Sequence, residues 1–215
     1  MSDTMNIGVD EAGRGPVIGP LVVCAFASAS QSHLRELGVK DSKDLSVKRR
    51  NELFPILSKM PHKVIICSPE RIDNSNNLNT LEVELFAEAL AIMPEGEIML
   101  DACDVNANRF ANNVSKLSGR VCYAEHKADE NHPEVSAASI IAKVTRDRIV
   151  SEISEELGFD IGSGYPSDPK TKAAVIELIK GDKPHDCLRW SWKTVENAWG
   201  GPPPPRPNAS QQTLF

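Results

Sequence analysis

The stretch NIGVDEAGRGP, residues 6–16, joins a short apolar run to two adjacent acids and a glycine-rich turn. Aliphatic and β-branched residues bounded by Gly and Pro are typical of a buried strand. The run ends in Asp10 and Glu11, so rigid backbone would hold both carboxylates at the edge of a sheet. Carboxylate oxygens suit a hard divalent cation such as Mg²⁺ or Mn²⁺. The stretch therefore predicts a strand that ends at a candidate metal site.

Two further acids extend this pattern. Asp101 ends the apolar run 97–101, and Asp129 follows the run 121–124. Carboxylates at several strand ends suggest a metal-dependent phosphoryl-transfer site. Asp104 is a rival to Asp101, but it falls past the strand end and reads better as the N-cap of the next helix.

The pair Asp10 and Glu11 presents a geometric difficulty. Successive side chains of a strand point to opposite faces of the sheet. We therefore expect a bend or bulge at the strand end if both carboxylates serve one site. Crowded carboxylates repel one another, so some of their pKa values should be raised until cations bind.

Composition limits the function classes. The chain has 215 residues, 40% of them hydrophobic, and a net charge of −6. It contains no apolar run of the roughly 20 residues that span a bilayer and no signal peptide, which predicts a cytoplasmic protein. The five cysteines form no CxxC pair, which favours reduced thiols and no zinc site. The negative charge argues against nonspecific coating of nucleic acid but not against a nucleic-acid enzyme.

The hydrophobic patterns alternate between strand and helix up to about residue 125, which predicts an α/β fold. The expected strands cover 6–11, 20–27, 63–67, 97–101 and 120–124, with the second antiparallel to the first. The first expected helix follows Ser46 as its N-cap, and Pro55 should kink or shorten it. The other expected helices are 78–92, a segment through 110–117, 133–157, a segment after Asp168, and 191–198.

Two glycine-rich loops are candidate binding segments. The run from Gly13 to Gly19 lacks the Lys-Ser/Thr ending of a phosphate loop, which argues against an ATPase. It fits a tight turn whose backbone and Arg14 face a ligand, or an ordinary hairpin turn. In the loop 162–168, Tyr165 could stack on a sugar or base.

Basic residues cluster in three places. Lys43 lies in the first cluster and Lys143 in the second, while the third extends over 170–193. Each cluster by itself fits a solvated helix face. Together the three clusters could form a phosphate-binding groove beside the acidic centre.

The chain end differs in composition from the rest. Residues 199–215 begin with a proline-rich stretch that should form an extended linker. The final residues, 211–215, are QQTLF. They fit either a docking peptide on a disordered tether or a terminus without a role.

Taken in order, these segments resemble ribonuclease HII, the type 2 ribonuclease H family, and most closely its archaeal members. The motifs that carry the resemblance are GVDEAGRG at 8–15, GPLV at 19–22, VKDSKDL at 39–45, EHKAD at 125–129, SAASIIAKV at 136–144 and GSGY at 162–165. Their order and spacing cover most of residues 6–195.

The resemblance implies a ribonuclease H-like fold, with a mixed central sheet flanked by helices and a helical C-terminal extension from about residue 160. It implies a catalytic domain over 1–198 that hydrolyses RNA in RNA–DNA hybrids and incises duplex DNA 5′ of embedded ribonucleotides, by two-metal-ion catalysis with Mg²⁺ or Mn²⁺. By motif position it assigns the four catalytic and metal-binding acids as Asp10, Glu11, Asp101 and Asp129. It assigns substrate binding to Gly13, Arg14, Gly15, Lys43, Lys143 and Tyr165.

The resemblance also bears on partners. Archaeal members often end in a peptide that docks a replication sliding clamp, which here would use Gln211, Leu214 and Phe215. This chain stops at Phe215, where the usual pattern continues to a paired aromatic end. We expect a monomer. The alternatives are another ribonuclease H-like nuclease and a hybrid-binding module without catalysis.

Overall fold

The computed structural model describes residues 4–206, which form parts of two compact units. The sheet unit comprises the residues up to Arg14, then 21–67 and 76–148. The helical unit comprises 15–20, 68–75 and the chain from Ile149 onward. Among residues 4–206, no helix combines the length and the apolar character needed to cross a membrane.

The sheet unit is built on a mixed sheet of five strands in the order β3-β2-β1-β4-β5. The strands are β1 (Met5–Ala12), β2 (Leu21–Ser28), β3 (His62–Cys67), β4 (Gly96–Asp101) and β5 (Cys122–Glu125). Strand β2 pairs antiparallel with β1 and β3, whereas β4 pairs parallel with β1 and β5. The five expected strands and the antiparallel first pair are confirmed.

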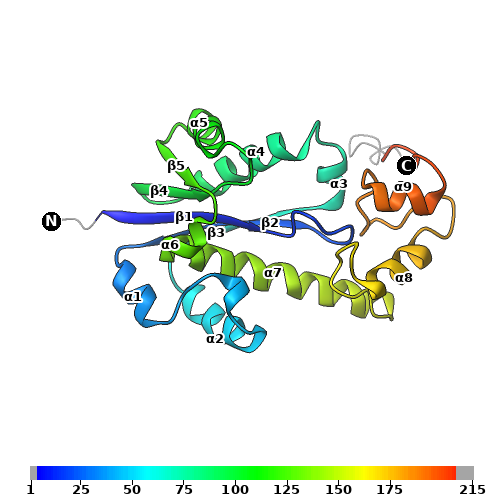
Figure 1. Cartoon of the computed structure of the whole chain (residues 1–215), viewed down its shortest axis with the longest axis horizontal. Helices are drawn as coiled ribbons and strands as arrows, with labels where there is room; N and C mark the ends of the chain where they lie inside the picture. Colours follow the sequence, from blue (N-terminus) through cyan, green and yellow to red (C-terminus); the bar gives the residue numbers. More distant parts are fainter. Residues whose placement is uncertain (1–3, 207–215) are drawn as a thin grey trace, which may run out of the picture. The chain divides into compact units, whose positions relative to one another are not determined.

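Helices cover both faces of this sheet (Figure 1). On one face lie α4 (Leu78–Leu90) and α5 (Ala107–Ser118). On the other lie α1 (Gln31–Glu36), α2 (Val47–Leu57), α6 (Ala128–Asn131) and the first part of α7 (Pro133–Leu157). The expected mixed α/β sheet flanked by helices is therefore confirmed.

Local capping chemistry explains where two of these helices begin. The Ser46 hydroxyl accepts a hydrogen bond from the backbone N–H of Arg49, so Ser46 is the N-cap of α2 as expected. The expectation for Asp104 was wrong: Asn106 is the N-cap of α5. The Asp104 carboxylate instead accepts the backbone N–H of Asn106 and forms an ion pair with Arg109. Both Asp104 and Asn106 carry a side-chain oxygen that can cap a helix. In the folded chain the Asn106 oxygen accepts the N–H of Arg109, and so α5 begins after Asn106.

Gly8 lets α7 pack directly on the sheet. A Cβ atom at Gly8 would lie 2.3 Å from the backbone carbon of Glu134 and the nitrogen of Val135, closer than real contacts allow. Only a residue without a side chain fits between β1 and the first turn of α7. Gly8 therefore determines how closely the first turn of α7 packs against β1.

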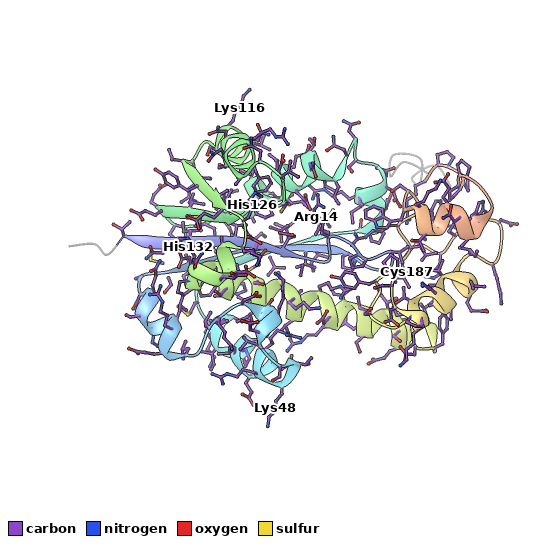
Figure 2. The ribbon with its side chains drawn as sticks, viewed as in Figure 1. Arg14, Lys48, Lys116, His126, His132 and Cys187 are labelled. Carbon is purple, nitrogen blue, oxygen red and sulfur yellow. The ribbon has the colours of Figure 1, made fainter. Side chains whose placement is uncertain are left out.

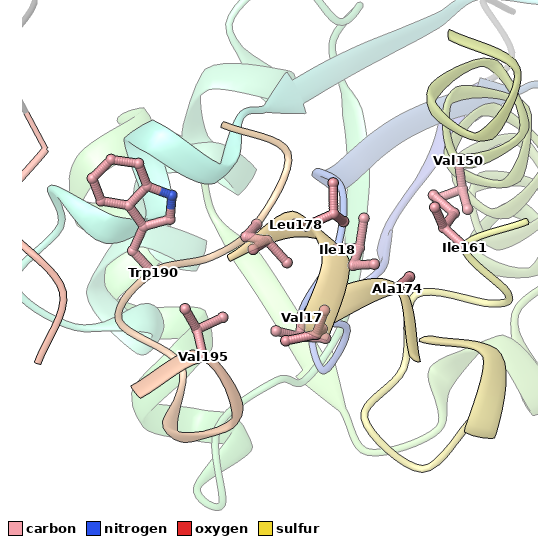
Figure 3. Packing of buried hydrophobic residues seen from close by; sticks show 10 residues of the cluster. Val17, Ile18, Val150, Ile161, Ala174, Leu178, Trp190 and Val195 are labelled. Atoms are coloured by element: carbon pink, nitrogen blue, oxygen red, sulfur yellow. The ribbon is translucent and has the colours of Figure 1, made fainter. Parts of the chain in front are cut away.

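The helical unit has its own apolar core. It contains α3 (Pro69–Asp73), α8 (Pro169–Leu178), α9 (Lys193–Trp199) and α7 from Ile149 onward. Figure 3 shows the buried cluster, in which Val17 and Ile18 of the glycine-rich run pack with Leu178, Trp190 and Val195. The expected helical extension is confirmed, while the short helices α1, α3 and α6 were not anticipated.

The start of the proline-rich stretch is described as far as Arg206, while Gln211, Leu214 and Phe215 lie outside the described residues. An extended linker was expected from residue 199. The structure has α9 ending at Trp199, and the side chain of Arg206 is buried. The described part of this stretch is therefore attached to the helical unit at Arg206.

Candidate active site

The ends of β1 and β4 bring three acids together. Because β4 runs parallel to β1, with Val9 opposite Leu100, the residues after these positions meet at one edge of the sheet. Carboxylate oxygens of Asp10, Glu11 and Asp101 all lie within 4.8 Å of one another. These three residues are called the acidic cluster below.

Of the two devices expected to bring Asp10 and Glu11 together, a bend or a bulge, the bulge is absent from the β1–β2 pairing. The β1–β2 register advances one residue at a time from Asn6 opposite Ser28 to Ala12 opposite Val22, so no residue is inserted. The pairing of β1 with β4 stops at Val9. The backbone N–H of Glu11 donates to Asp10 Oδ1 at 2.7 Å. The two carboxylates therefore approach each other where β1 has lost its β4 partner but remains paired with β2.

Neighbouring groups orient the other two carboxylates of the cluster. The Cys103 thiol donates to Glu11 Oε2 at 3.1 Å. The backbone N–H of Ala128 donates to Asp101 Oδ1 at 2.9 Å. His126, labelled in Figure 2, lies near Asp101, and a positive charge on this ring when it is protonated lowers the pKa of that carboxyl.

Asp129 adjoins the acidic cluster from α6 rather than from a strand. Its side chain is 1% exposed, and neither carboxylate oxygen has a hydrogen-bond partner. Lys43 Nζ lies 3.5 Å from Asp129 Oδ2. The Ser136 hydroxyl donates to the Asp129 backbone carbonyl at 2.5 Å and so fixes this turn. Asp129 thus presents two buried oxygens that still require partners.

Burial and mutual repulsion raise the pKa values of these acids. Burial raises the pKa of Asp10 well above its ordinary value, and the charges of Glu11, Asp101 and Asp129 raise it further. Burial is also the first cause of the raised pKa values of Glu11 and Asp101. Burial raises the pKa of Asp129 to about 6, although the Lys43 ammonium opposes this change. Burial is the largest cause of all four shifts, and repulsion by neighbouring carboxylates adds to it at Asp10, Glu11 and Asp129.

The residues present fit a divalent cation. The donors are all carboxylate oxygens, which Mg²⁺ and Mn²⁺ prefer. The Asp129 oxygens have no hydrogen-bond partner and only the single ion pair with Lys43, and the pKa of Asp10 is raised, so the site lacks positive charge. A bound cation would supply that charge.

Lys43 is held beside Asp129 by a short turn. The Asp41 side chain caps the 3₁₀ segment Ser42–Asp44 by accepting the N–H of Lys43 at 2.9 Å. The hydroxyl groups of Ser42 and Ser139 lie 2.8 Å apart, which ties the turn to α7. Lys143, by contrast, forms an ion pair with Asp147 at 2.8 Å. The structure therefore places Lys43, but not Lys143, next to an acid of the proposed site.

Arg14 is held by α4. Its Nε lies 2.7 Å from Glu82 Oε1, and its Nη2 donates to Asn79 Oδ1 at 2.7 Å. Glu82 is fully buried, and Gly13 precedes Arg14 with a φ of 90°, which favours glycine. Figure 2 labels Arg14 beside this helix.

Sequence reasoning missed Asn79, Glu82 and Cys103. The available signal for Glu82 was a charged residue beside Leu81 and Leu85, among the apolar positions of the helix 78–92. For Cys103 the signal was its place two residues after Asp101. Neither signal shows which residue is contacted, because Glu82 is 68 positions from Arg14 and Cys103 is 92 positions from Glu11.

The helical unit brings Gly15 and Tyr165 together. A Cβ atom at Gly15 would lie 3.6 Å from Tyr165 Cε1. The backbone N–H of Val17 donates to the Gly164 carbonyl at 2.8 Å, which joins the two loops. Tyr165 is 36% exposed, so part of its surface faces solvent. Two of the expected substrate-binding residues are therefore adjacent.

Comparison with known proteins places the chain in a family. The family model for ribonuclease HII matches residues 7–195. Ribonuclease HII of Methanocorpusculum labreanum is 45% identical over 197 residues, covering 88% of this chain and 92% of the relative.

Solved structures agree with this match. In the PCNA:RNase HII complex from Archaeoglobus fulgidus, the matched chain is 42% identical with a TM-score of 0.82, covering 88% of this chain and 95% of that one. The ribonuclease H2 from Pyrococcus horikoshii is 41% identical with a TM-score of 0.84, covering 91% and 97%. The expected ribonuclease H-like fold is confirmed, and the chain belongs to the ribonuclease HII family and is a ribonuclease H.

Proposed function

We propose that this ribonuclease cleaves RNA in RNA–DNA hybrids and incises duplex DNA on the 5′ side of embedded ribonucleotides, using two divalent cations. The observation that carries the proposal is the acidic cluster within 4.8 Å together with Asp129, whose buried oxygens have no hydrogen-bond partner. Such a site favours Mg²⁺ or Mn²⁺ over softer metals. The family match supports the hydrolysis of RNA.

The acidic cluster and Asp129 would hold the cations through carboxylate oxygens. When bound, the two ions supply the charge that activates the attacking water and stabilises the leaving 3′ oxygen. The N–H groups of Glu11 and Ala128 orient Asp10 and Asp101, and the Cys103 thiol orients Glu11. Rigid orientation matters because a displaced ligand would misplace the scissile phosphate. The protein itself then needs no nucleophilic side chain.

Substrate recognition would come from two loops and two lysines. The backbone of Gly13 to Gly15 would approach the 2′-hydroxyl, the group that distinguishes RNA from DNA at a single nucleotide. The Tyr165 ring would stack on the sugar or base beside it. Lys43, which is 75% exposed, and less directly Lys143, would contact backbone phosphates.

A comparison of three duplexes tests this function: an RNA–DNA hybrid, DNA with one ribonucleotide, and all-DNA of the same sequence. We expect cleavage of the first two with Mg²⁺ or Mn²⁺, products with 5′ phosphates, and no cleavage in excess chelator. Equal cleavage of the all-DNA duplex would favour a different ribonuclease H-like nuclease. Binding of the hybrid without cleavage under any metal would indicate a hybrid-binding module.

We also propose a sliding clamp as a partner. The matched Archaeoglobus protein is described in complex with PCNA. Here the docking peptide would be residues 211–215, with Gln211, Leu214 and Phe215 as its anchors. Removal of residues 209–215 should abolish binding to the cognate clamp in calorimetry while cleavage of short oligonucleotides stays unchanged. The full-length variant Leu214→Ala/Phe215→Ala should lose clamp binding too, because it lacks two of the anchors. Clamp binding that survives both in this variant and in the truncated protein would refute the assignment.

The proposed organisation is a catalytic domain over 1–198 followed by a tail over 199–215, acting as a monomer in the cytoplasm. The five free cysteines, at widely separated positions, suit a reducing compartment. Light scattering should give a mass near 23.5 kDa. A mass twice as large would exclude the monomer.

A further inference from the structure

Arg206 is unusual for a residue in a proline-rich tail. It follows Pro202–Pro205, yet its side chain is only 5% exposed. A long charged side chain is almost never buried unless it is paired. The environment of Arg206 therefore indicates a specific attachment.

The attachment uses the whole guanidinium group. Arg206 Nε lies 2.7 Å from Asp73 Oδ2, and Nη2 donates to the carbonyls of Asp186, at 3.2 Å, and Leu188. The guanidinium carbon also lies 4.3 Å from the centre of the Trp190 ring. A planar group that pairs with a carboxylate and stacks on a ring at once is a geometry lysine cannot reproduce.

The receiving carboxylate is held independently of the tail. Asp73, at the end of α3, accepts the backbone N–H groups of Trp190 at 2.8 Å and Ser191 at 2.9 Å. The Ser191 hydroxyl donates to it at 2.6 Å. The side chain of Asp73 is 6% exposed. Because these bonds do not involve the tail, the Asp73 carboxylate is already oriented to bind Arg206.

The prolines before Arg206 are attached less firmly. They line a cavity of about 580 Å³ together with Asp73, Trp190 and Glu196. Pro202, Pro204 and Pro205 are exposed and Pro203 is half-buried, so this segment gains little from packing. The attachment is therefore concentrated at Arg206, and loss of that side chain should release the segment back to the end of α9 at Trp199.

We propose that Arg206 fastens the tail to the helical unit, so that the stretch leading to the clamp-docking peptide begins at a fixed point near Asp73 and Trp190. The functional part of this inference rests on the proposed clamp docking. Between Arg206 and Gln211 there are four residues, 207–210, whereas eleven residues, 200–210, would separate Trp199 from Gln211. The local concentration of a tethered group falls roughly as the −3/2 power of tether length, so release would lower it roughly fourfold.

The attachment itself is tested by NMR on the full-length protein. We would measure the order parameter of the Nε–H group of Arg206 and compare it with two internal references. Buried Arg189, whose Nε donates to the Gly19 carbonyl at 3.1 Å, is the rigid reference, and exposed Arg35 is the mobile one. A value nearer to that of Arg189 supports the proposal, and a value nearer to that of Arg35 overturns it.

The consequence is tested by clamp-stimulated cleavage of DNA with one ribonucleotide, at subsaturating enzyme. Arg206→Ala and Arg206→Lys should reduce the stimulation roughly fourfold, with clamp affinity in calorimetry and cleavage without clamp unchanged. Lys183→Ala is the matched control. Its Nζ lies 6.0 Å from the same Trp190 ring, but the side chain is 56% exposed and belongs to the body of the unit.

The two proposals fail in distinguishable ways. If removal of residues 209–215 leaves clamp stimulation unchanged, clamp docking fails, while the order parameter still decides whether Arg206 is fastened. If stimulation depends on residues 209–215 but Arg206→Ala equals wild type, docking stands and the role of Arg206 in positioning the peptide is refuted.

Discussion

The acidic site of the sheet unit and the buried arginines of the helical unit hold their charges in opposite ways. In the sheet unit, Asp10 and Asp129 are buried among like charges, and their pKa values are raised. In the helical unit, Arg189 is fully buried and the side chain of Arg206 is 5% exposed, but each donates to a carbonyl oxygen and lies over a tryptophan ring. Removal of one partner from a buried and paired charge destabilises a fold, whereas buried like charges raise one another's pKa values and favour a cation between them. The presence or absence of complementary partners therefore distinguishes buried charges that serve the proposed metal site from buried charges that serve the fold.

The largest expected effect comes from Asp10→Asn. It should reduce kcat roughly a thousandfold, because several kcal/mol of charge stabilisation depend on the bound ions. Relief of repulsion should raise stability by about 1 kcal/mol, or roughly 2–4 °C in Tm. Steady-state kinetics and calorimetry without metal would measure both. A variant that loses activity and stability together would show that Asp10 is structural and would break the comparison.

Arg189→Met should give the opposite pattern. Its fully buried side chain donates to the Gly19 carbonyl, which would lose a partner. We expect a loss of roughly 2–3 kcal/mol in the free energy of unfolding, while kcat of the folded protein stays within about threefold. Denaturant titration combined with activity at low temperature measures the two quantities. A large loss of kcat in fully folded protein would contradict a purely architectural role.

Tyr165→Ala sharpens the comparison, since Tyr165 is a candidate functional residue in the otherwise architectural helical unit. Cleavage at a single ribonucleotide should fall roughly tenfold or more, given what a stacked ring contributes. Thermal stability should change little, because the ring is partly exposed. Tyr165→Phe keeps the ring and serves as the control. Equal losses in the two variants would shift the role from the ring to the hydroxyl.

The smallest expected effect is a pH dependence of stability in metal-free protein. The folded-state pKa of Asp129 is raised to about 6, so the native state binds its proton more tightly than the unfolded chain does. The unfolding free energy should therefore decrease as pH rises from about 5 to 7, by about 1 kcal/mol from this residue. Urea titrations of wild type and Asp129→Asn measure the difference. Saturating Mg²⁺ should flatten the wild-type profile, and a slope that metal does not change would contradict the cation site.

Sequence alone determined the elements that depend on short-range pattern. The strands around Ile7 and Leu100 follow from compact apolar runs, and the cap at Ser46 follows from a local hydrogen bond. Asp10 and Asp101 could be identified because the strand before each of them fixes its place at the edge of the sheet. Local signals failed where two choices were equivalent, as at Asp104 and Asn106, or where an element was only one or two turns long, as in α1, α3 and α6.

Tertiary structure decided which distant residues act together. Glu82 reaches Arg14 across 68 positions, and Asp73 reaches Arg206 across 133. No pattern in the chain couples such pairs, because their interaction depends on how packed elements place single atoms. Composition predicted a free linker at Pro202–Pro205, since proline cannot join a helix or a sheet interior. The buried guanidinium of Arg206 reverses that expectation at one residue: a receptor made of Asp73, Trp190 and Ser191 exists only after the chain has folded.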